Sequence, residues 1–161
     1  FEDFDRFQPS PEWDELRSTG VTLINQARFG RWQLPPDWVQ ISPDVTLPAD
    51  FKPRFSYDAI RIPLYLVWGK KHHDVELDAF KNFWEFFEGA PFTPAWTDLT
   101  DNSVGTYDAA PGFYSIMRLV YAASGSLKTV HRKTEENSER EPYYSNSLRL
   151  LTAVARKETH L

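Results

Sequence analysis

Hydrophobic positions recur at helical spacing in five stretches of the chain, and this pattern predicts five helices. The first stretch opens at Ser10 and Pro11, a helix cap followed by a first-turn proline, and Gly30 closes it. Its apolar positions are Trp13, Leu16, Leu23, Ile24 and Ala27. The other helices are predicted from about Tyr57 to Trp68, from about Asp74 to Glu88, after Pro111-Gly112 and after Pro142.

These predicted helices differ in how much of their surface is apolar. The stretch from Tyr57 to Trp68 is apolar on nearly every side, so we expect it to be buried between neighbours. Pro63 within it marks either the first turn or a kink. The last three helices each have one apolar face. Those faces comprise Ala79, Phe80, Phe83, Trp84 and Phe87; Phe113, Ile116, Met117, Val120 and Tyr121; and Tyr144, Leu148, Leu151, Val154 and Ala155.

Long loops separate the helices. Residues 31–52 are rich in proline, and residues 129–141 form a charged stretch typical of a solvated connector. Residues 93–109 could hold a β-hairpin, because Trp96-Thr97 and Thr106-Tyr107 flank the turn-prone Asp101-Asn102-Ser103. Helices and strands do not alternate. The pattern therefore predicts an all-α fold of antiparallel helical hairpins, the unit of α/α toroids.

Composition narrows the function classes. A chain of 161 residues can form one domain with a substantial core. Its net charge of -5 and lack of a basic run argue against nucleic-acid binding, and no stretch approaches the length of a membrane span. The absence of cysteine excludes a disulfide scaffold. Aromatic residues make up 16%, which suits a core rich in rings and also a carbohydrate site, because sugar rings pack on aromatic faces.

One pair of charges stands at the start of the second predicted helix. Asp58 and Arg61 are three residues apart and therefore share a helix face. The pair is either a helix cap with a salt bridge, or a general base that the cation and the helix N-terminus keep ionised. Tyr57 beside it could orient the carboxylate or a water.

Several other residues are candidates for substrate contact. Asp37 and Trp38 lie in a loop that could overhang a cleft, where Trp38 is either a sugar platform or a plug that holds the loop down. Tyr143 and Tyr144 open the last helix about 100° apart, so only one of them can face a cleft. Weaker candidates for outer sugar subsites are Trp96 and Tyr107.

A metal site is not expected. His72-His73-Asp74 is the only histidine cluster, and adjacent histidines point apart on a helix. His131 and His160 lie in a charged loop and in the tail. The sequence also contains no glycine-rich phosphate loop and no nucleophile elbow, and the function expected below requires no cofactor.

The run Ser56-Tyr57-Asp58-Ala59-Ile60-Arg61, preceded by Leu34-Pro35-Pro36-Asp37-Trp38-Val39, resembles the C-terminal half of glycoside hydrolase family 8. The nearest resemblance within the family is to the endo-β-1,4-glucanases associated with bacterial cellulose synthase. It covers nearly the whole chain, and the Tyr-Asp-Ala-x-Arg segment is its most specific part. Supporting segments, in the same order, are Ala27-Arg28-Phe29-Gly30, Gly112-Phe113-Tyr114-Ser115 and Tyr143-Tyr144-Ser145-Asn146-Ser147-Leu148.

The resemblance implies an (α/α)6 barrel of twelve helices that cleaves β-1,4-glucan internally with inversion. It makes Asp58 the general base, positioned by Tyr57 and Arg61. The family's general acid is a glutamate in a Ser-Glu-Gly context, which does not occur in these 161 residues. We therefore expect residues 1–161 to be a single piece, the C-terminal part of one catalytic domain whose N-terminal half is absent. Alone, it is expected to be inactive.

The expected function is that of a cellulase, an endo-β-1,4-glucanase to which this chain supplies the general base. Its expected partners are β-1,4-glucan, the N-terminal half with the general-acid glutamate, and the cellulose synthase machinery, in the periplasm or outside a bacterial cell. Two alternatives stay open. One is a family 8 hydrolase for xylan, chitosan or mixed-linkage glucan, and the other is a non-catalytic glucan-binding or assembly subunit.

Overall fold

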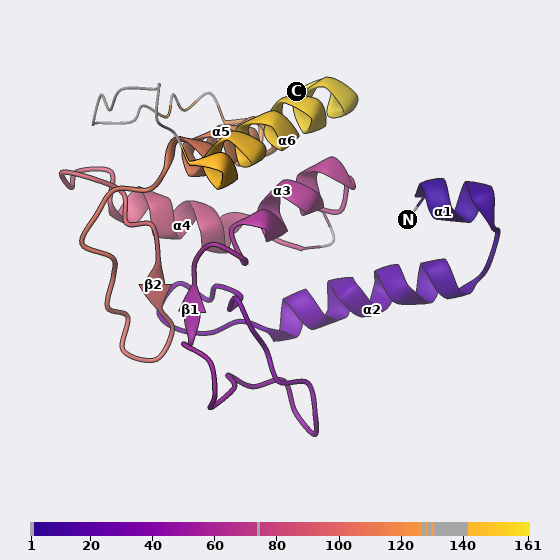
Figure 1. The fold of residues 1–161 in the computed structure, drawn as a ribbon, viewed down its shortest axis with the longest axis horizontal. Coiled ribbons are helices and arrows are strands. Elements are labelled where there is room, and N and C mark those ends of the chain that lie inside the picture. The colour runs from indigo at the N-terminus through magenta and orange to yellow at the C-terminus, as the bar shows by residue number, and fades with distance from the viewer. Residues whose placement is uncertain (1, 74, 127, 129, 131–141) are drawn as a thin grey trace.

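The computed structural model describes residues 2–73, 75–126, 128, 130 and 142–161, and this part is mostly helical (Figure 1). The predicted all-α class is confirmed. Most of the charged connector at 129–141, with His131, lies outside the described residues, as does Asp74. The helices are α1 Glu2–Phe7, α2 Glu12–Gln26, α3 Arg61–Trp68, α4 Asp78–Phe86, α5 Pro111–Ala123 and α6 Tyr143–Thr159, and the strands are β1 Arg54–Phe55 and β2 Thr97–Asp98.

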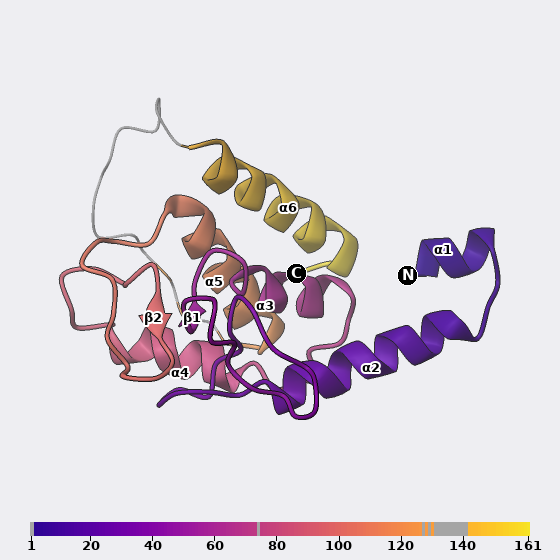
Figure 2. The same cartoon turned by 60° about the horizontal axis from the view of Figure 1, so that its bottom comes forward.

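Helices α5 and α6 lie side by side, and α3 packs against both (Figures 1 and 2). The predicted apolar face of α5 is buried, and Leu148 and Ala155 of α6 are buried against the same core. The two helices approach closely at Gly112, whose N–H donates to Ser145 Oγ at 2.8 Å. A Cβ at position 112 would lie 2.5 Å from the Ser145 carbonyl oxygen. This crossing therefore requires glycine.

Helix α3 begins four residues later than the sequence pattern predicts. Residues 57–60 form turns, and the helix proper runs from Arg61 to Trp68. Pro63 is its third residue, so it occupies the first turn and causes no kink. Leu64 and Val67 are fully buried, whereas Tyr65 is half-exposed. One side of α3 therefore stays open, which differs from the predicted burial on nearly every side.

Two other predicted boundaries differ from the structure. The first predicted helix ends at Gln26 instead of reaching Gly30, which adopts a φ of +67° in the turns that follow. Phe29 and Leu34 pair there as an antiparallel bridge, so this segment doubles back on itself. Helix α4 spans Asp78–Phe86 and is shorter than predicted at both ends. Its residues Phe80, Phe83 and Trp84 are buried in the core, as predicted.

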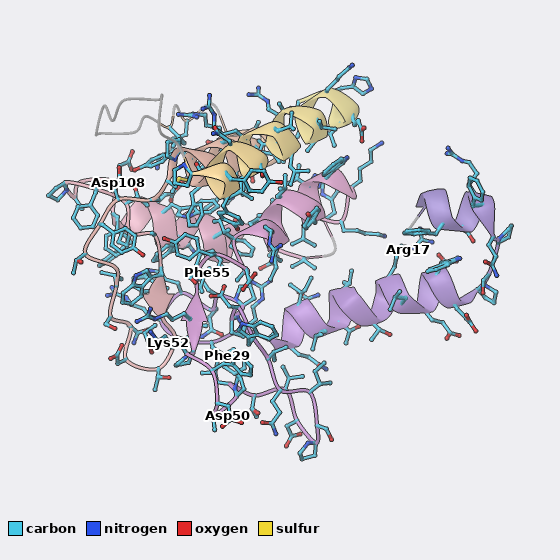
Figure 3. All side chains as sticks on the ribbon, in the orientation of Figure 1. Arg17, Phe29, Asp50, Lys52, Phe55 and Asp108 are labelled. Carbon is cyan, nitrogen blue, oxygen red and sulfur yellow. The ribbon has the colours of Figure 1, made fainter. Side chains whose placement is uncertain are left out.

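The small sheet joins two distant segments. Strand β1 pairs antiparallel with β2, with Arg54 opposite Asp98 and Phe55 opposite Thr97. Near the predicted hairpin the chain does reverse, but only isolated bridges link its two sides. The buried ring of Phe55 lies 5.8 Å, centroid to centroid, from each of Phe80 and Phe83 (Figure 3). This anchor fixes the end of β1, from which the chain turns directly into the segment that carries Asp58.

Helices α1 and α2 extend away from the other helices in both views (Figures 1 and 2). Helix α2 has no buried residue. The Phe4 ring stacks on Trp13 with centroids 5.5 Å apart, which ties α1 to α2, but Phe7 is 95% exposed. Within the described chain, much of the apolar surface of these two helices is therefore left uncovered.

Candidate active site

Asp58 lies in the turn between β1 and α3, with half of its side chain exposed. Arg61 Nη2 donates to Asp58 Oδ1 at 2.5 Å, and Arg61 Nε donates to the Asp58 carbonyl oxygen at 3.3 Å. Among the described residues, Oδ2 accepts no hydrogen bond. The carboxylate is thus held through one oxygen by a cation, and its other oxygen is available to a water. A general base needs this combination of fixed orientation and a free acceptor.

Asp37, in the loop after α2, is bound to the turn that carries Asp58 by several hydrogen bonds. Its Oδ1 accepts hydrogen bonds from three backbone N–H groups, those of Ser56 at 3.0 Å, Asp58 at 3.1 Å and Ala59 at 2.8 Å. Its Oδ2 accepts from the Ser56 hydroxyl. The sequence suggests a substrate contact at Asp37. In the structure both of its carboxylate oxygens accept hydrogen bonds from the protein itself.

Tyr144 of α6 reaches the same turn. Its phenol donates to the backbone carbonyl of Tyr57, and the two rings meet edge to face with centroids 6.0 Å apart. Burial raises the pKa of Tyr144 to about 12, with the charge of Arg61 acting in the opposite direction and that of Asp58 adding to the rise. The phenol is therefore a protonated donor throughout the neutral range.

Tyr57 is held by its neighbours. Its hydroxyl shares a hydrogen bond of 3.1 Å with that of Tyr107, and its ring meets Phe113 edge to face at 5.4 Å. Burial and the Tyr107 hydrogen bond raise the pKa of Tyr57 to about 12. Among the described residues its phenol makes no hydrogen bond to the Asp58 carboxylate. Any positioning of Asp58 by Tyr57 therefore acts through the backbone of the turn.

The two remaining candidates lie on exposed surface. Trp38 stacks on Phe51 with centroids 4.8 Å apart and an interplanar angle of 18°, and both rings are about half-exposed. Tyr143 is 89% exposed at the first position of α6, whereas Tyr144 contacts the Asp58 turn. Only one of the two adjacent tyrosines therefore reaches this turn, in line with their helical offset. The residues that the structure brings together are Asp37, Tyr57, Asp58, Arg61 and Tyr144.

A family model described as glycosyl hydrolases family 8 matches residues 1–158. The chain belongs to this family. It is 36% identical over 152 residues to a probable endoglucanase of Novacetimonas hansenii, an alignment that covers 92% of this chain and 42% of that protein. It is 37% identical over 109 residues to an endoglucanase of Cellulomonas uda, covering 66% of this chain and 30% of that protein.

Solved structures of family 8 enzymes have the same arrangement. The endo-β-1,4-glucanase CMCax from Acetobacter xylinum matches with a TM-score of 0.81 and 32% identity. An endoglucanase from Komagataeibacter sucrofermentans matches with a TM-score of 0.80 and 31% identity. Each match covers 98% of this chain and 48% of the other. The family 8 chain thus spans about half the length of these relatives, and its helices correspond to half of an (α/α)6 barrel.

Two residues around the Asp58 turn of this family 8 chain have no positioning role that the sequence alone predicts. Ser56 donates both its hydroxyl and its N–H to Asp37, 19 residues away, and no local sequence signal indicates such a contact. The sequence makes Tyr107 a candidate only for an outer sugar subsite, whereas in the structure its hydroxyl shares a hydrogen bond with that of Tyr57. The other such candidate, Trp96, has the Arg54 guanidinium 3.6 Å from its ring centroid, so that cation covers one of its faces.

The histidine pair lies elsewhere in the family 8 chain. The rings of His72 and His73 are 4.2 Å apart, and burial together with His73 lowers the pKa of His72. In the described ranges, no three His, Cys, Asp or Glu residues are grouped so that they could hold a metal.

A cavity of about 310 Å³ lies beside the histidine pair. Its lining includes Ser124, just past the end of α5, whereas Tyr57 packs near the start of α5. This cavity is therefore separate from the Asp58 turn.

None of the described helices combines enough length with enough apolar character to cross a bilayer.

Proposed function

We propose that this chain forms the base-carrying half of an inverting endo-β-1,4-glucanase. The observation that carries the proposal is the Asp58 carboxylate, half-exposed, bound to Arg61 through Oδ1 and, among the described residues, without a hydrogen bond at Oδ2. It lies just before α3, where the helix dipole favours a negative charge. Family membership and relatives named endoglucanases support the same assignment.

The reaction needs two carboxyl groups with different roles. Asp58 Oδ2 would take a proton from a water as the water oxygen bonds to the anomeric carbon from the face opposite the leaving group. As the glycosidic bond breaks, a carboxylic acid on the other side protonates the leaving oxygen. In inverting enzymes the two groups stand about 6.5–9.5 Å apart, which leaves room for that water.

The general acid would come from a separate part of the enzyme, an N-terminal half that carries a glutamate. Two observations support such a partner. Alignments that cover more than nine-tenths of this chain cover only 42% to 48% of the relative's own length. Helices α1 and α2 also expose aromatic surface, with no buried residue on α2. We propose that the missing half covers this surface.

Substrate contacts are assigned to exposed aromatic side chains. Trp38 is held in one orientation by stacking on Phe51, so its exposed surface is a preformed platform for a sugar ring. Tyr143 has an almost fully exposed ring and is the second candidate. Because glucan is a polymer, we propose that the enzyme works in the periplasm or outside the cell, where an exporting cellulose synthase would be its neighbour.

The test uses the complete protein, with this chain and its other half together. On cello-oligosaccharides, proton NMR should show the α-anomer first at each new reducing end, and carboxymethyl cellulose should lose viscosity rapidly because internal bonds are cut. This chain alone should hydrolyse neither. First appearance of the β-anomer would contradict inversion. Glucan binding without hydrolysis would favour a binding subunit, and faster cleavage of xylan or chitosan would reassign the substrate.

A further inference from the structure

We infer that Asp37 is a positioning residue that holds the turn at residues 56–59 and thereby fixes the direction of the Asp58 carboxylate. The catalytic part of this inference rests on the proposed function, in which Asp58 is the base. The structural part rests only on the contacts of Asp37. These two parts can be tested separately.

The first step is the hydrogen-bonding need of the turn. Backbone N–H groups at the start of a helix have no acceptor within the helix, and a local side chain usually caps them. At α3 the first N–H groups donate to backbone carbonyl oxygens of the turn at residues 56–59, not to a side chain. The N–H groups of that turn, from Ser56, Asp58 and Ala59, are accepted by one oxygen of Asp37, from 19 to 22 residues away in sequence. Such charge-assisted bonds are stronger than neutral ones.

The second step is the rigidity of Asp37 itself. Its own N–H donates to the Arg54 carbonyl oxygen at 2.6 Å, which fastens it to the chain at β1. The preceding Leu34, Pro35 and Pro36 are buried. Proline restricts the backbone, so the loop approaches Asp37 along a fixed path. A side chain that is itself fixed in this way can hold the turn in one conformation.

The third step separates positioning from substrate contact. Oδ1 of Asp37 already accepts three hydrogen bonds and Oδ2 accepts one from the Ser56 hydroxyl. A sugar hydroxyl would have to compete with these bonds and would loosen the turn that holds Asp58. The contacts of Asp37 therefore favour a role exerted through the backbone of the turn.

The experiment compares Asp37→Ala and Asp37→Asn in the complete protein, with Asp44→Asn as the control. Asp44 is an exposed aspartate of the same loop, and its carboxylate has no partner among the described residues. Two readouts are measured: hydrogen exchange of the backbone amides of residues 56–59, and kcat and KM on cello-oligosaccharides. The exchange measurement does not depend on activity.

Asp37→Ala should speed exchange of the amides that Asp37 now binds and should lower kcat about 10- to 100-fold, with KM changed less than about 2-fold, because a misplaced catalytic group costs rate. Asp37→Asn keeps an acceptor oxygen and should recover part of both effects. The control should match wild type. If Asp37→Ala does not fold, Asp37→Asn against wild type still decides the outcome through the same two readouts.

A raised KM with unchanged kcat and unchanged amide exchange would overturn the inference and favour a substrate contact. Unchanged exchange together with unchanged kinetics would overturn it as well. If Asp37→Ala speeds amide exchange but Asp58→Asn is as active as wild type, the structural part of the inference is upheld. The catalytic part and the proposed function would then both be wrong.

Discussion

The phenol of Tyr144 donates a hydrogen bond to the backbone carbonyl of Tyr57, 87 residues earlier in the chain. This bond ties the last helix to the turn that carries Asp58. The N–H groups of that turn bind Asp37, while its Tyr57 carbonyl binds Tyr144. The turn is therefore held by two segments far apart in sequence, the loop after α2 and the start of α6.

Replacing Tyr144 by phenylalanine tests the second of these contacts. The ring packing is kept, but the Tyr57 carbonyl loses its donor, so the free energy of unfolding should fall by about 1 kcal/mol. In the complete enzyme, kcat should fall several-fold with little change in KM. Tyr65→Phe is the matched control, because the Tyr65 hydroxyl has no hydrogen-bond partner among the described residues. Equal results for the two variants, measured by urea denaturation and kinetics, would argue against this role.

The Trp38 platform makes a different kinetic prediction. Trp38→Ala should raise KM for long cello-oligosaccharides about 2- to 10-fold and leave kcat nearly unchanged, because a stacking contact to a sugar ring is lost. Trp38→Phe should restore part of the affinity. Ile41→Ala removes another exposed apolar side chain of the same loop and serves as the control. A Trp38→Ala enzyme with wild-type KM would show that the ring only holds the loop down.

Gly112 should be the least replaceable glycine of the described chain. A Cβ there would meet the Ser145 carbonyl at 2.5 Å and Leu148 Cβ at 2.9 Å, so Gly112→Ala should push α5 and α6 apart and cost about 1–3 kcal/mol. Gly20→Ala is the control, because a Cβ at this position of α2 meets nothing within 4 Å. It should be neutral or stabilise by up to about 1 kcal/mol. Thermal denaturation that fails to separate the two would contradict the described crossing.

Alkaline pH should destabilise the site. The pKa values of Tyr57 and Tyr144 are raised from 10.0 to about 12, so the folded chain holds these protons more tightly than the unfolded chain. The resulting stability is fully present below about pH 10 and is lost as the pH rises toward about 12. Urea denaturation across this range should show a smaller loss for a Tyr57→Phe/Tyr144→Phe variant than for wild type. Equal losses of stability in wild type and in the double variant would contradict this prediction.

Local patterns were sufficient to predict most helices. The apolar face of α5 repeats at regular helical spacing and ends up buried as expected, and the Pro at its first position marks its start. The sequence pattern predicts too early a start for α3, because residues 57–60 are apolar enough to continue the helical pattern. Their turn is set by Asp37, a contact from outside the segment. Periodicity carries no information about such a contact.

Long-range pairing explains what the sequence did not reveal about the site. Asp58, Arg61 and Tyr57 were found together because they are neighbours in one short motif. The role of Asp37 depends on hydrogen bonds across 19 to 22 residues, and that of Tyr107 on a bond to Tyr57 across 50 residues. The pairing of β1 with β2 likewise joins segments that no local pattern connects.

The central claim is that Asp58 is the base, and Asp58→Asn tests it most directly. In the complete enzyme this variant keeps the shape of the side chain but cannot take a proton from water, so kcat should fall about 100- to 10,000-fold. Asp50→Asn, a change of an exposed aspartate, should leave activity unaltered (Figure 3). Hydrolysis of cello-oligosaccharides is the measurement. A fall of this size in Asp58→Asn alone is the predicted result, and near-wild-type activity of Asp58→Asn would contradict the account.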